Sequence, residues 1–255
     1  MTGKPQNGAF QKFVAVPEIS AARIPSKTTF SEASVLPLAI STASSGLFQP
    51  DYLELPYPTV SQSGSTPSSD KVIVVWGGSS SVGTTALQLC RASGVETITT
   101  ASKHNHDYCK GLGASHVIDH NSSSAVDDVV AAIKSSGKSF AGVFDTISVP
   151  DTVKAGVAIL QEAGGLKRLV TTLPGSDKGL PEDIKANAVF ATTIFTKHAE
   201  VGQAVWGKFV PEALESGALK PLPEPLVIGK GLENVQKGLD KNKEGVSAKK
   251  VVVEL

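Results

Sequence analysis

The sequence is poor in several features that mark whole classes of protein. It has two cysteines, Cys90 and Cys109, and neither stands in a CxxC or zinc-ribbon spacing. Such sparse use excludes a disulfide-stapled secreted scaffold and fits a reducing compartment, so a cytoplasmic location is expected. No apolar run approaches the roughly 20 residues that span a bilayer, and residues 1–10 lack the apolar core of a signal peptide. We therefore expect no membrane partner.

The sequence also lacks an excess of charge of either sign. Lys plus Arg and Asp plus Glu each number 24, so the net charge is zero. A neutral chain exerts no long-range attraction on nucleic acid, and no nucleic-acid partner is expected. A hydrophobic content of 40% is ordinary for a globular domain. The length of 255 residues favours one large unit, or one domain with a fragment of another.

Strands and helices alternate through the middle of the chain. The apolar run at residues 72–76 is typical of a strand buried on both faces of a parallel sheet. Each of four further strands follows a helix, which predicts an α/β fold with a doubly wound parallel sheet. A sixth strand, at residues 188–195, would complete that sheet. The first five predicted strands cover residues 72–76, 95–100, 115–119, 140–145 and 166–172, with helices at 84–93, 107–112, 125–134 and 151–161.

The flanking segments have weaker patterns. Ser31 is the predicted N-cap of a helix start, and an apolar helix is predicted at residues 36–48. Residues 50–70 are rich in Pro, Ser and Thr without a period, which predicts a long loop. The C-terminal part is predicted as helix 197–216, strand 224–228, helix 231–240 and strand 249–254.

A glycine-rich turn joins the first strand to its helix. Backbone N–H groups in such a turn, together with the positive end of the helix, can hold a diphosphate. Gly78 is predicted to permit the tight turn and Gly83 to let the helix pack closely, with Ser80 at the middle position of a G-x-G-x-x-G variant. A serine-glycine loop in an unrelated α/β fold is the alternative. The predicted diphosphate site comprises Gly78, Ser79, Ser80, Ser81, Val82 and Gly83.

The end of the second strand indicates which dinucleotide would bind. An acidic residue there would hold the ribose 2′-hydroxyl of NAD, but no acid occurs before Asp107. Ser102 can donate a hydrogen bond to a 2′-phosphate and Lys103 can neutralise it. The sequence therefore favours NADPH in a Rossmann-type site. The alternative is that Lys103 only points into solvent.

Several motifs, in order along nearly the whole chain, resemble one superfamily. Residues 74–83 read VVWGGSSSVG and residues 112–119 read LGASHVID. Further matching pieces are residues 8–13, 35–39, 143–145, 231–233 and 249–253. The sequence resembles the medium-chain dehydrogenase/reductase superfamily. Within it, the chain looks like the quinone-oxidoreductase and fungal trans-enoyl-reductase branch, often labelled zinc-binding alcohol-dehydrogenase-like.

The resemblance implies an NADPH-dependent oxidoreductase that transfers hydride to an activated double bond, a quinone or a carbonyl of a small molecule. It also implies a homodimer, because relatives usually pair their sheet edges. Packing at the sheet edge is the alternative role for the apolar positions among the implied cofactor contacts. Those contacts are Ser102 and Lys103 at the 2′-phosphate, Tyr108 at a ribose or phosphate, Asp119 at the adenine edge, Ile147 at the ribose side, and Leu173 and Phe195 near the nicotinamide.

The chain departs from the family pattern at its N-terminal end. Relatives begin with a GroES-like catalytic domain, and residues 8–10 correspond to the end of that domain. We expect a residual, truncated GroES-like domain at residues 1–34, an NADP(H)-binding Rossmann domain at 35–198, and a C-terminal return to the catalytic domain at 199–255. Exposed edges and apolar surface are expected where partner strands are missing. A truncated nucleotide-binding module, or a remnant without turnover, is the alternative function.

No metal and no catalytic residue are assigned. The family position that supplies a cysteine ligand falls at residues 38–42, which read LAIST, so no catalytic zinc is expected. His104 and His106 stand two residues apart at a helix start, which aims their imidazoles apart. Hydride transfer needs no protein nucleophile. The possible proton donors, none with supporting context, are Tyr52, Tyr57, Tyr108 and His198.

Overall fold

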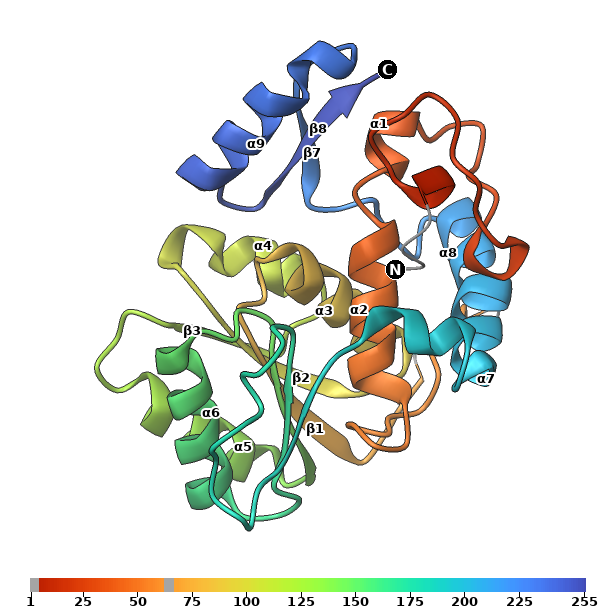
Figure 1. Ribbon diagram of the computed structural model, residues 1–255. Coiled ribbons are helices and arrows are strands. Elements are labelled where there is room, and N and C mark those ends of the chain that lie inside the picture. Colours follow the sequence, from red (N-terminus) through yellow and green to blue (C-terminus); the bar gives the residue numbers. More distant parts are fainter. Residues whose placement is uncertain (1–4, 62–66) are drawn as a thin grey trace.

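A six-stranded parallel sheet forms the centre of the computed structural model, which describes residues 5–61 and 67–255 (Figure 1). The strand order is β3-β2-β1-β4-β5-β6, with the chain reversing direction across the sheet between β1 and β4. The prediction of a doubly wound parallel sheet is confirmed. The strands are β1 (Lys71–Trp76), β2 (Glu96–Ala101), β3 (His116–Asp119), β4 (Ser139–Asp145), β5 (Arg168–Thr171) and β6 (Lys185–Ala188).

Helices cover both faces of this sheet and enclose two hydrophobic cores. Alternate residues of β1 face opposite ways, so Ile73 packs into one core and Val74 into the other. The first core is covered by α2 (Pro37–Phe48), α3 (Ser81–Ala92) and α4 (His106–Gly111). The second is covered by α5 (Ala125–Ser136) and α6 (Pro150–Ala163). The helices predicted between the strands are all present, with ends shifted by a few residues.

Two predicted local features are wrong. The predicted strand at 188–195 is displaced, because β6 ends at Ala188 and Ala191–Phe195 forms a 3-10 helix. Ile194 of that helix is fully buried in the first core, so tertiary packing overrides the strand propensity of this segment. The N-cap is Thr29 rather than Ser31. Its side chain accepts a hydrogen bond from the Glu32 amide, while the Glu32 carboxylate accepts one from the Thr29 amide, before α1 (Phe30–Ala33).

A continuous helical segment, residues 199–216, packs against α2. It consists of α7 (Ala199–Gly202), a π-helix (Gln203–Phe209) and α8 (Val210–Ser216), and its apolar side chains join the first core. The Trp206 indole donates a hydrogen bond of 3.2 Å to the Ser41 hydroxyl. The six-stranded sheet and the helices that cover it are called the sheet unit below. Residues 199–216 of the predicted 199–255 domain therefore pack against this sheet unit. The domain boundaries themselves stay predictions.

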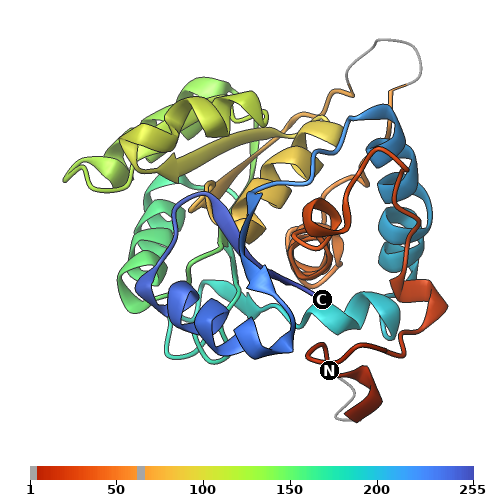
Figure 2. The ribbon, with the colours of Figure 1, turned by 90° about the horizontal axis from the view of Figure 1, so that it is seen from above.

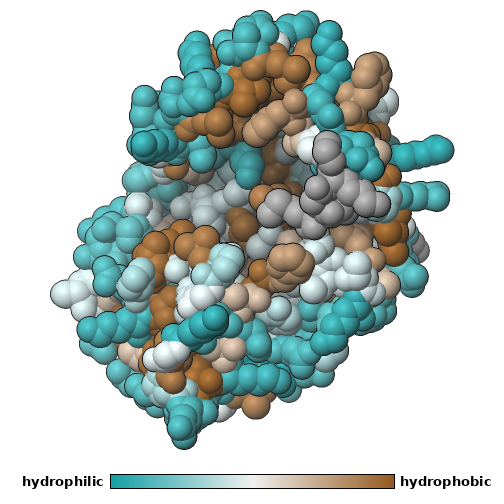
Figure 3. Space-filling model, viewed as in Figure 1, coloured by the Kyte–Doolittle hydropathy of each residue, from teal (hydrophilic) through white to brown (hydrophobic). Residues whose placement is uncertain are grey.

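The last part of the chain forms a small separate unit. In β7 (Glu224–Lys230), α9 (Val235–Glu244) and β8 (Lys249–Glu254), two parallel strands are connected through a helix. This C-terminal unit, in blue, lies above the edge of the sheet unit and beside α1 (Figures 1 and 2). The Ser31 hydroxyl donates a 2.6 Å hydrogen bond to the Glu254 carboxylate, which ties α1 to β8. Hydrophobic side chains gather on the surface of this unit (Figure 3), and Leu239 of α9 is 50% exposed.

Further short 3-10 helices lie in the connecting segments, at Pro5–Asn7, Glu18–Ser20, Lys103–Asn105 and Leu232–Asn234. Residues 49–61 and 67–70 contain no helix or strand, in agreement with the predicted loop, of which residues 62–66 lie outside the described part. Residues 1–4 of the predicted 1–34 domain also lie outside it. Within the described ranges, no helix is long and apolar enough to cross a membrane.

Candidate nucleotide site

A cleft opens at the carboxyl ends of β1, β2 and β4. Its volume is about 340 Å³, and ligands of open α/β sheets bind at this kind of position, where the strand order reverses. Most of its lining comes from the sheet unit, and the rest comes from the loop that precedes β8. The lining residues are Trp76, Gly77, Ser79, Ser80, Thr100, Ala101, Ser102, Asn105, His120, Ile147, Thr152, Val246, Ser247 and Ala248.

One of the two glycines predicted to shape the turn has a different role from the one predicted. The left-handed residue is Gly77, with φ of +86°, and not Gly78. Gly78 is needed for close packing instead, because a Cβ atom there would lie 2.2 Å from the Thr99 hydroxyl oxygen. At Gly83 a Cβ atom would lie 2.2 Å from the Gly77 carbonyl oxygen. The close approach predicted for Gly83 is therefore present, between the helix and the turn.

Hydroxyl groups hold the turn in place. The Ser80 hydroxyl caps α3 by accepting a 3.0 Å hydrogen bond from the Gly83 amide, and it lies 2.8 Å from the Thr146 hydroxyl. Thr146 in turn donates to the Trp76 carbonyl at 2.8 Å. Because the Ser80 side chain has these partners, the groups left to face an anion are the Ser79 and Ser81 hydroxyls and the first amides of α3. The amides of Ser81 and Val82 have no intrahelical acceptor.

The end of β2 brings Ser102 and Lys103 beside the end of β3. The Ser102 hydroxyl lies 3.0 Å from His120 Nε2, and Lys103 Nζ lies 3.9 Å from an Asp119 carboxylate oxygen. The Asn121 backbone N–H, with help from Lys103, lowers the pKa of Asp119. Lys103 is 83% exposed, so its ammonium is free to move toward a ligand. Ser102 and His120 line one polar end of the cleft, and Lys103 and Asp119 lie beside them.

The remaining predicted contacts are only partly brought together. Ile147 lines the cleft, and the Tyr108 hydroxyl lies behind it, 3.1 Å from the Thr84 hydroxyl. Burial raises the pKa of Tyr108 to about 12, so this phenol remains protonated at neutral pH. Leu173 lines a different groove, beside α6, and Phe195 packs against Trp206 with ring centroids 6.4 Å apart. Neither residue lines the cleft, and their nicotinamide role stays a prediction.

Asp145 fixes the wall that carries Ile147, a role that the sequence analysis missed. Its buried carboxylate accepts hydrogen bonds from the Ile147 amide at 3.0 Å, the Ser148 amide at 2.9 Å and the Thr152 hydroxyl at 2.7 Å. These bonds hold Ser148 in the left-handed region, with φ of +61°. Burial raises the pKa of Asp145, and the three hydrogen bonds oppose that change. An Asp at the carboxyl end of a buried strand is the available signal.

The C-terminal unit supplies part of the lining of the cleft, a contribution that the sequence analysis also missed. The Ser247 hydroxyl lies 3.1 Å from His104 Nε2 and accepts a 3.0 Å hydrogen bond from the Asn105 amide group. Lys250 Nζ lies 3.3 Å from the Ser81 hydroxyl oxygen. These pairs are separated by 142 residues or more, so no local pattern could have indicated them.

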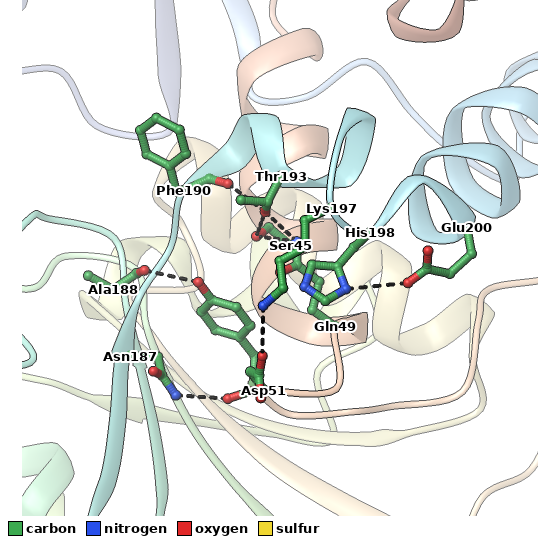
Figure 4. Close-up of polar contacts among 11 residues, drawn as sticks. Ser45, Gln49, Asp51, Asn187, Ala188, Phe190, Thr193, Lys197, His198 and Glu200 are labelled. Carbon is green, nitrogen blue, oxygen red and sulfur yellow. Dashed lines mark hydrogen bonds and ion pairs between the residues drawn. The ribbon is translucent and has the colours of Figure 1, made fainter.

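Two of the possible proton donors, Tyr52 and His198, have structural partners away from the cleft. Figure 4 shows the network that joins the end of α2 to the segment after β6. The Tyr52 hydroxyl donates to the Ala188 carbonyl at 3.1 Å, and His198 Nδ1 lies 3.4 Å from the Glu200 carboxylate. Gln49 donates to the Thr193 hydroxyl at 2.6 Å in the same network. No proton donor is assigned from these contacts.

Residues 5–61 and 67–255 contain no group of three or more His, Cys, Asp and Glu side chains that could hold a metal ion. The neighbouring imidazoles of His104 and His106 have separate partners, because His106 Nε2 lies 3.2 Å from the Ala101 carbonyl. The predicted absence of catalytic zinc stays a prediction.

Comparison with known proteins identifies the family. The model of the zinc-binding dehydrogenase family matches residues 81–208. The trans-enoyl reductase himH of Aspergillus japonicus is 41% identical over 256 residues, a match that spans all of this chain and 71% of himH. The chain belongs to the medium-chain dehydrogenase/reductase superfamily. It is an oxidoreductase of the medium-chain type.

A second relative supports this assignment, and a solved structure has the same fold. The dehydrogenase orsE of Emericella nidulans is 38% identical over 266 residues, covering all of this chain and 74% of orsE. The quinone oxidoreductase of Thermus thermophilus, solved also in complex with NADPH, superposes with a TM-score of 0.67 at 18% identity. That superposition covers 97% of this chain and 74% of the oxidoreductase. The Thermus oxidoreductase thus shares the fold of this chain.

Proposed function

We propose that this chain binds NADPH in the cleft at the end of β1 and transfers hydride to an activated double bond, a quinone or a carbonyl of a small molecule. The observation that carries the proposal is the donor set of the cleft. The Ser79 hydroxyl in the cleft, with the free amides and the Ser81 hydroxyl at the adjoining start of α3, suits a diphosphate. Ser102 and Lys103 suit a 2′-phosphate, because no acid ends β2.

The proposed cofactor supplies the hydride, and the residues of the chain bind and orient it. The proposed contacts with the cofactor are those predicted, with the Ser80 side chain acting as a helix cap rather than a phosphate ligand. Ile147 would pack against the ribose side, held there by Asp145. The names of himH and of the Thermus oxidoreductase support an enoyl or quinone acceptor.

Titration of the purified chain with NADPH and with NADH tests the binding step, followed by Trp76 fluorescence. We expect NADPH to bind more tightly. Oxidation of NADPH, read at its own absorbance band with a panel of quinones and enones, tests turnover. Binding without oxidation of NADPH by any acceptor would favour the alternative of a nucleotide-binding module. Binding of neither nucleotide would contradict the proposal.

Replacement of Lys103 by Glu tests the choice of nucleotide. The substitution places a negative charge beside the 2′-phosphate, so NADPH affinity should fall by about tenfold or more while NADH affinity stays nearly unchanged. Lys154→Glu, on α6, is the matched control for the same reversal of an exposed charge. An equal effect of the Lys103 substitution on both nucleotides would contradict the assignment of the 2′-phosphate site.

We also propose a homodimer that pairs through the open edge of β6, in the cytoplasm. The support is that β6 ends the sheet on one side and that both cysteines are free thiols. The domain division at residues 34 and 198 belongs to the same proposal. Light scattering on the eluting protein gives the mass, and a monomer at micromolar concentration would contradict the dimer.

A further inference from the structure

A second groove lies beside α6, the helix that covers the second core. Its volume is about 540 Å³, within the range of about 300–1,000 Å³ that is typical of small-molecule sites. One wall is a face of α6, where positions three and four residues apart are neighbours, made by Pro150, Val153, Lys154 and Val157. The other wall is the segment 173–181 that follows β5. This α6 groove shares no lining residue with the nucleotide cleft.

Most of the lining of the α6 groove is apolar. Val153 is 6% exposed and belongs to the second core, and Val157 and Leu180 pack against that core from the two walls. The groove is therefore an extension of the core that stays open to solvent. Because the burial of apolar surface is favourable, an apolar chain that covered this lining would be held there.

The charged side chains that line the α6 groove are both cationic. Lys154 on α6 and Lys178 on the opposite wall are exposed, and within residues 5–61 and 67–255 neither forms an ion pair. Asp177 is next to Lys178 in the sequence but does not line the groove, and Asp183 is paired with Lys167. The groove therefore offers two unpaired cations to an anionic group.

The length of the α6 groove favours a single chain over a protein partner. The face of α6 from Pro150 to Val157 is about 10 Å long, at about 1.5 Å per residue. A stable protein interface buries about 800 Å² on each partner, which a groove two helical turns long does not provide. The apolar lining and the two lysines fit one straight apolar chain with an anionic head group.

We propose that the α6 groove binds a free medium-chain fatty acid, with the alkyl chain along α6 and the carboxylate held by Lys154 and Lys178. The groove adjoins the nucleotide cleft, because Ser148 lines the groove, Ile147 lines the cleft, and the amides of both donate to the Asp145 carboxylate. The fatty acid thus has a site of its own beside the wall that Asp145 fixes. This inference does not rest on the proposed nucleotide binding, and it is tested without nucleotide.

Calorimetric titration of the nucleotide-free protein with decanoate tests the binding step, and decanol supplies the same chain without the charge. We expect one decanoate per chain, and decanol should bind at least several-fold more weakly. Lys154→Glu and Lys178→Glu should each weaken decanoate several-fold, since single exposed ion pairs are weak, and the double variant by about tenfold or more. Lys134→Glu, at an exposed position of α5 outside the groove, is the matched control and should bind decanoate as the wild type does.

The substitution Val157→Gln tests the apolar wall. It should weaken decanoate and decanol by a similar factor, because both chains lose the same apolar contact. Val126→Gln is the matched control, since Val126 on α5 is also partly buried against the second core but does not line the groove. An equal loss of decanoate binding in both variants would indicate damage to the core and would overturn the proposal.

Two charge reversals separate this site from the nucleotide cleft. Lys103→Glu should weaken NADPH and leave decanoate unchanged, and Lys154→Glu should do the reverse. Loss of decanoate binding in Lys103→Glu would place the fatty acid in the nucleotide cleft and overturn the inference. Decanol binding as tight as that of decanoate, lysine variants without effect, or no saturable binding of decanoate would overturn it as well. If the wild type binds decanoate and neither nucleotide, the proposed function alone fails.

Two measurements on the wild type complete the test. Acetic anhydride labels exposed amines, and decanoate should protect Lys154 and Lys178 several-fold while Lys134 is labelled as before. Equal labelling with and without decanoate would contradict the site. Light scattering with and without saturating decanoate should give the same mass. A mass that falls on addition of decanoate would show that a second copy of the chain covers the groove, which would also overturn the proposal.

Discussion

The sheet unit and the C-terminal unit both contain parallel strands joined through a helix, yet they bury those strands very differently. Every residue of β1 from Val72 to Trp76 is buried, whereas no residue of β7 or β8 is. Parallel strands are normally covered on both faces, and a pair of strands alone is marginally stable in water. The comparison indicates that the sheet unit carries the stability of the fold, and that the C-terminal unit depends on what it rests against.

The largest expected effect comes from breaking the sheet unit at its nucleotide turn. In Gly83→Val the new side chain collides with the Gly77 carbonyl, so both nucleotides should lose about a hundredfold in affinity or more. Gly111→Ala, with no atom within 4 Å of the added Cβ, is the matched control and should bind as the wild type does. Fluorescence titration measures both. Normal binding by Gly83→Val would contradict the packing role of this glycine.

Truncation of one valine in each unit measures the difference in burial directly. Val74→Ala removes two methyl groups from a fully buried position and should lower the free energy of unfolding by about 2 to 3 kcal/mol. Val253→Ala, on partly exposed β8, should lower it by less than about 1 kcal/mol. Urea denaturation followed by circular dichroism gives both values. Equal losses would mean that the two units share one core.

A smaller effect is expected where the two units meet. Ser247→Ala removes the acceptor of the Asn105 hydrogen bond and the contact with His104. The free energy of unfolding should fall by about 1 kcal/mol or less, and nucleotide affinity by a few-fold. Ser135→Ala, whose hydroxyl donates to the Ala132 carbonyl of its own helix, is a control of the same chemistry. Identical nucleotide affinity in both variants would show that the Ser247 contacts do not shape the cleft.

The smallest effect concerns pH and separates a buried carboxyl from an exposed one. Burial raises the pKa of Asp145 in the folded protein above its usual 3.8. The contribution of this carboxyl to stability is therefore fully present below pH 3.8 and is lost as pH rises through the folded-state pKa. Relative to the wild type, Asp145→Asn should therefore gain stability as pH rises from acid toward neutrality. Asp183, which Lys167 holds at a lowered pKa, should show the opposite trend in Asp183→Asn. Urea midpoints across this range test both signs.

The sequence predicts the sheet unit well because its signals are local. The apolar run of β1, the glycine turn and the following helices each depend on neighbouring residues. The sixth strand was misplaced because Lys185–Ala188 lacks the apolar, branched residues of a buried strand, while the segment after it has them. The left-handed conformation falls on Gly77 because two adjacent glycines could each adopt it.

The candidate site was predicted only on the sheet side. Ser79, Ser80, Ser102 and Ile147 do line the cleft, since each follows a strand end that the pattern revealed. Ser247 reaches it from the far end of the chain, and Lys250 reaches the adjoining start of α3. Nothing near either residue in the sequence marks these contacts. The hydroxyl network of Thr146 and Ser80 was missed for the same reason, because it joins residues 66 positions apart.

Since opposite walls of the cleft belong to the two units, a dinucleotide seated there would touch both of them. How tightly it is held would then depend on the contacts of Ser247 as well as on the glycine-rich turn. A chain cut before residue 246 would keep that turn and lose one wall of the cleft.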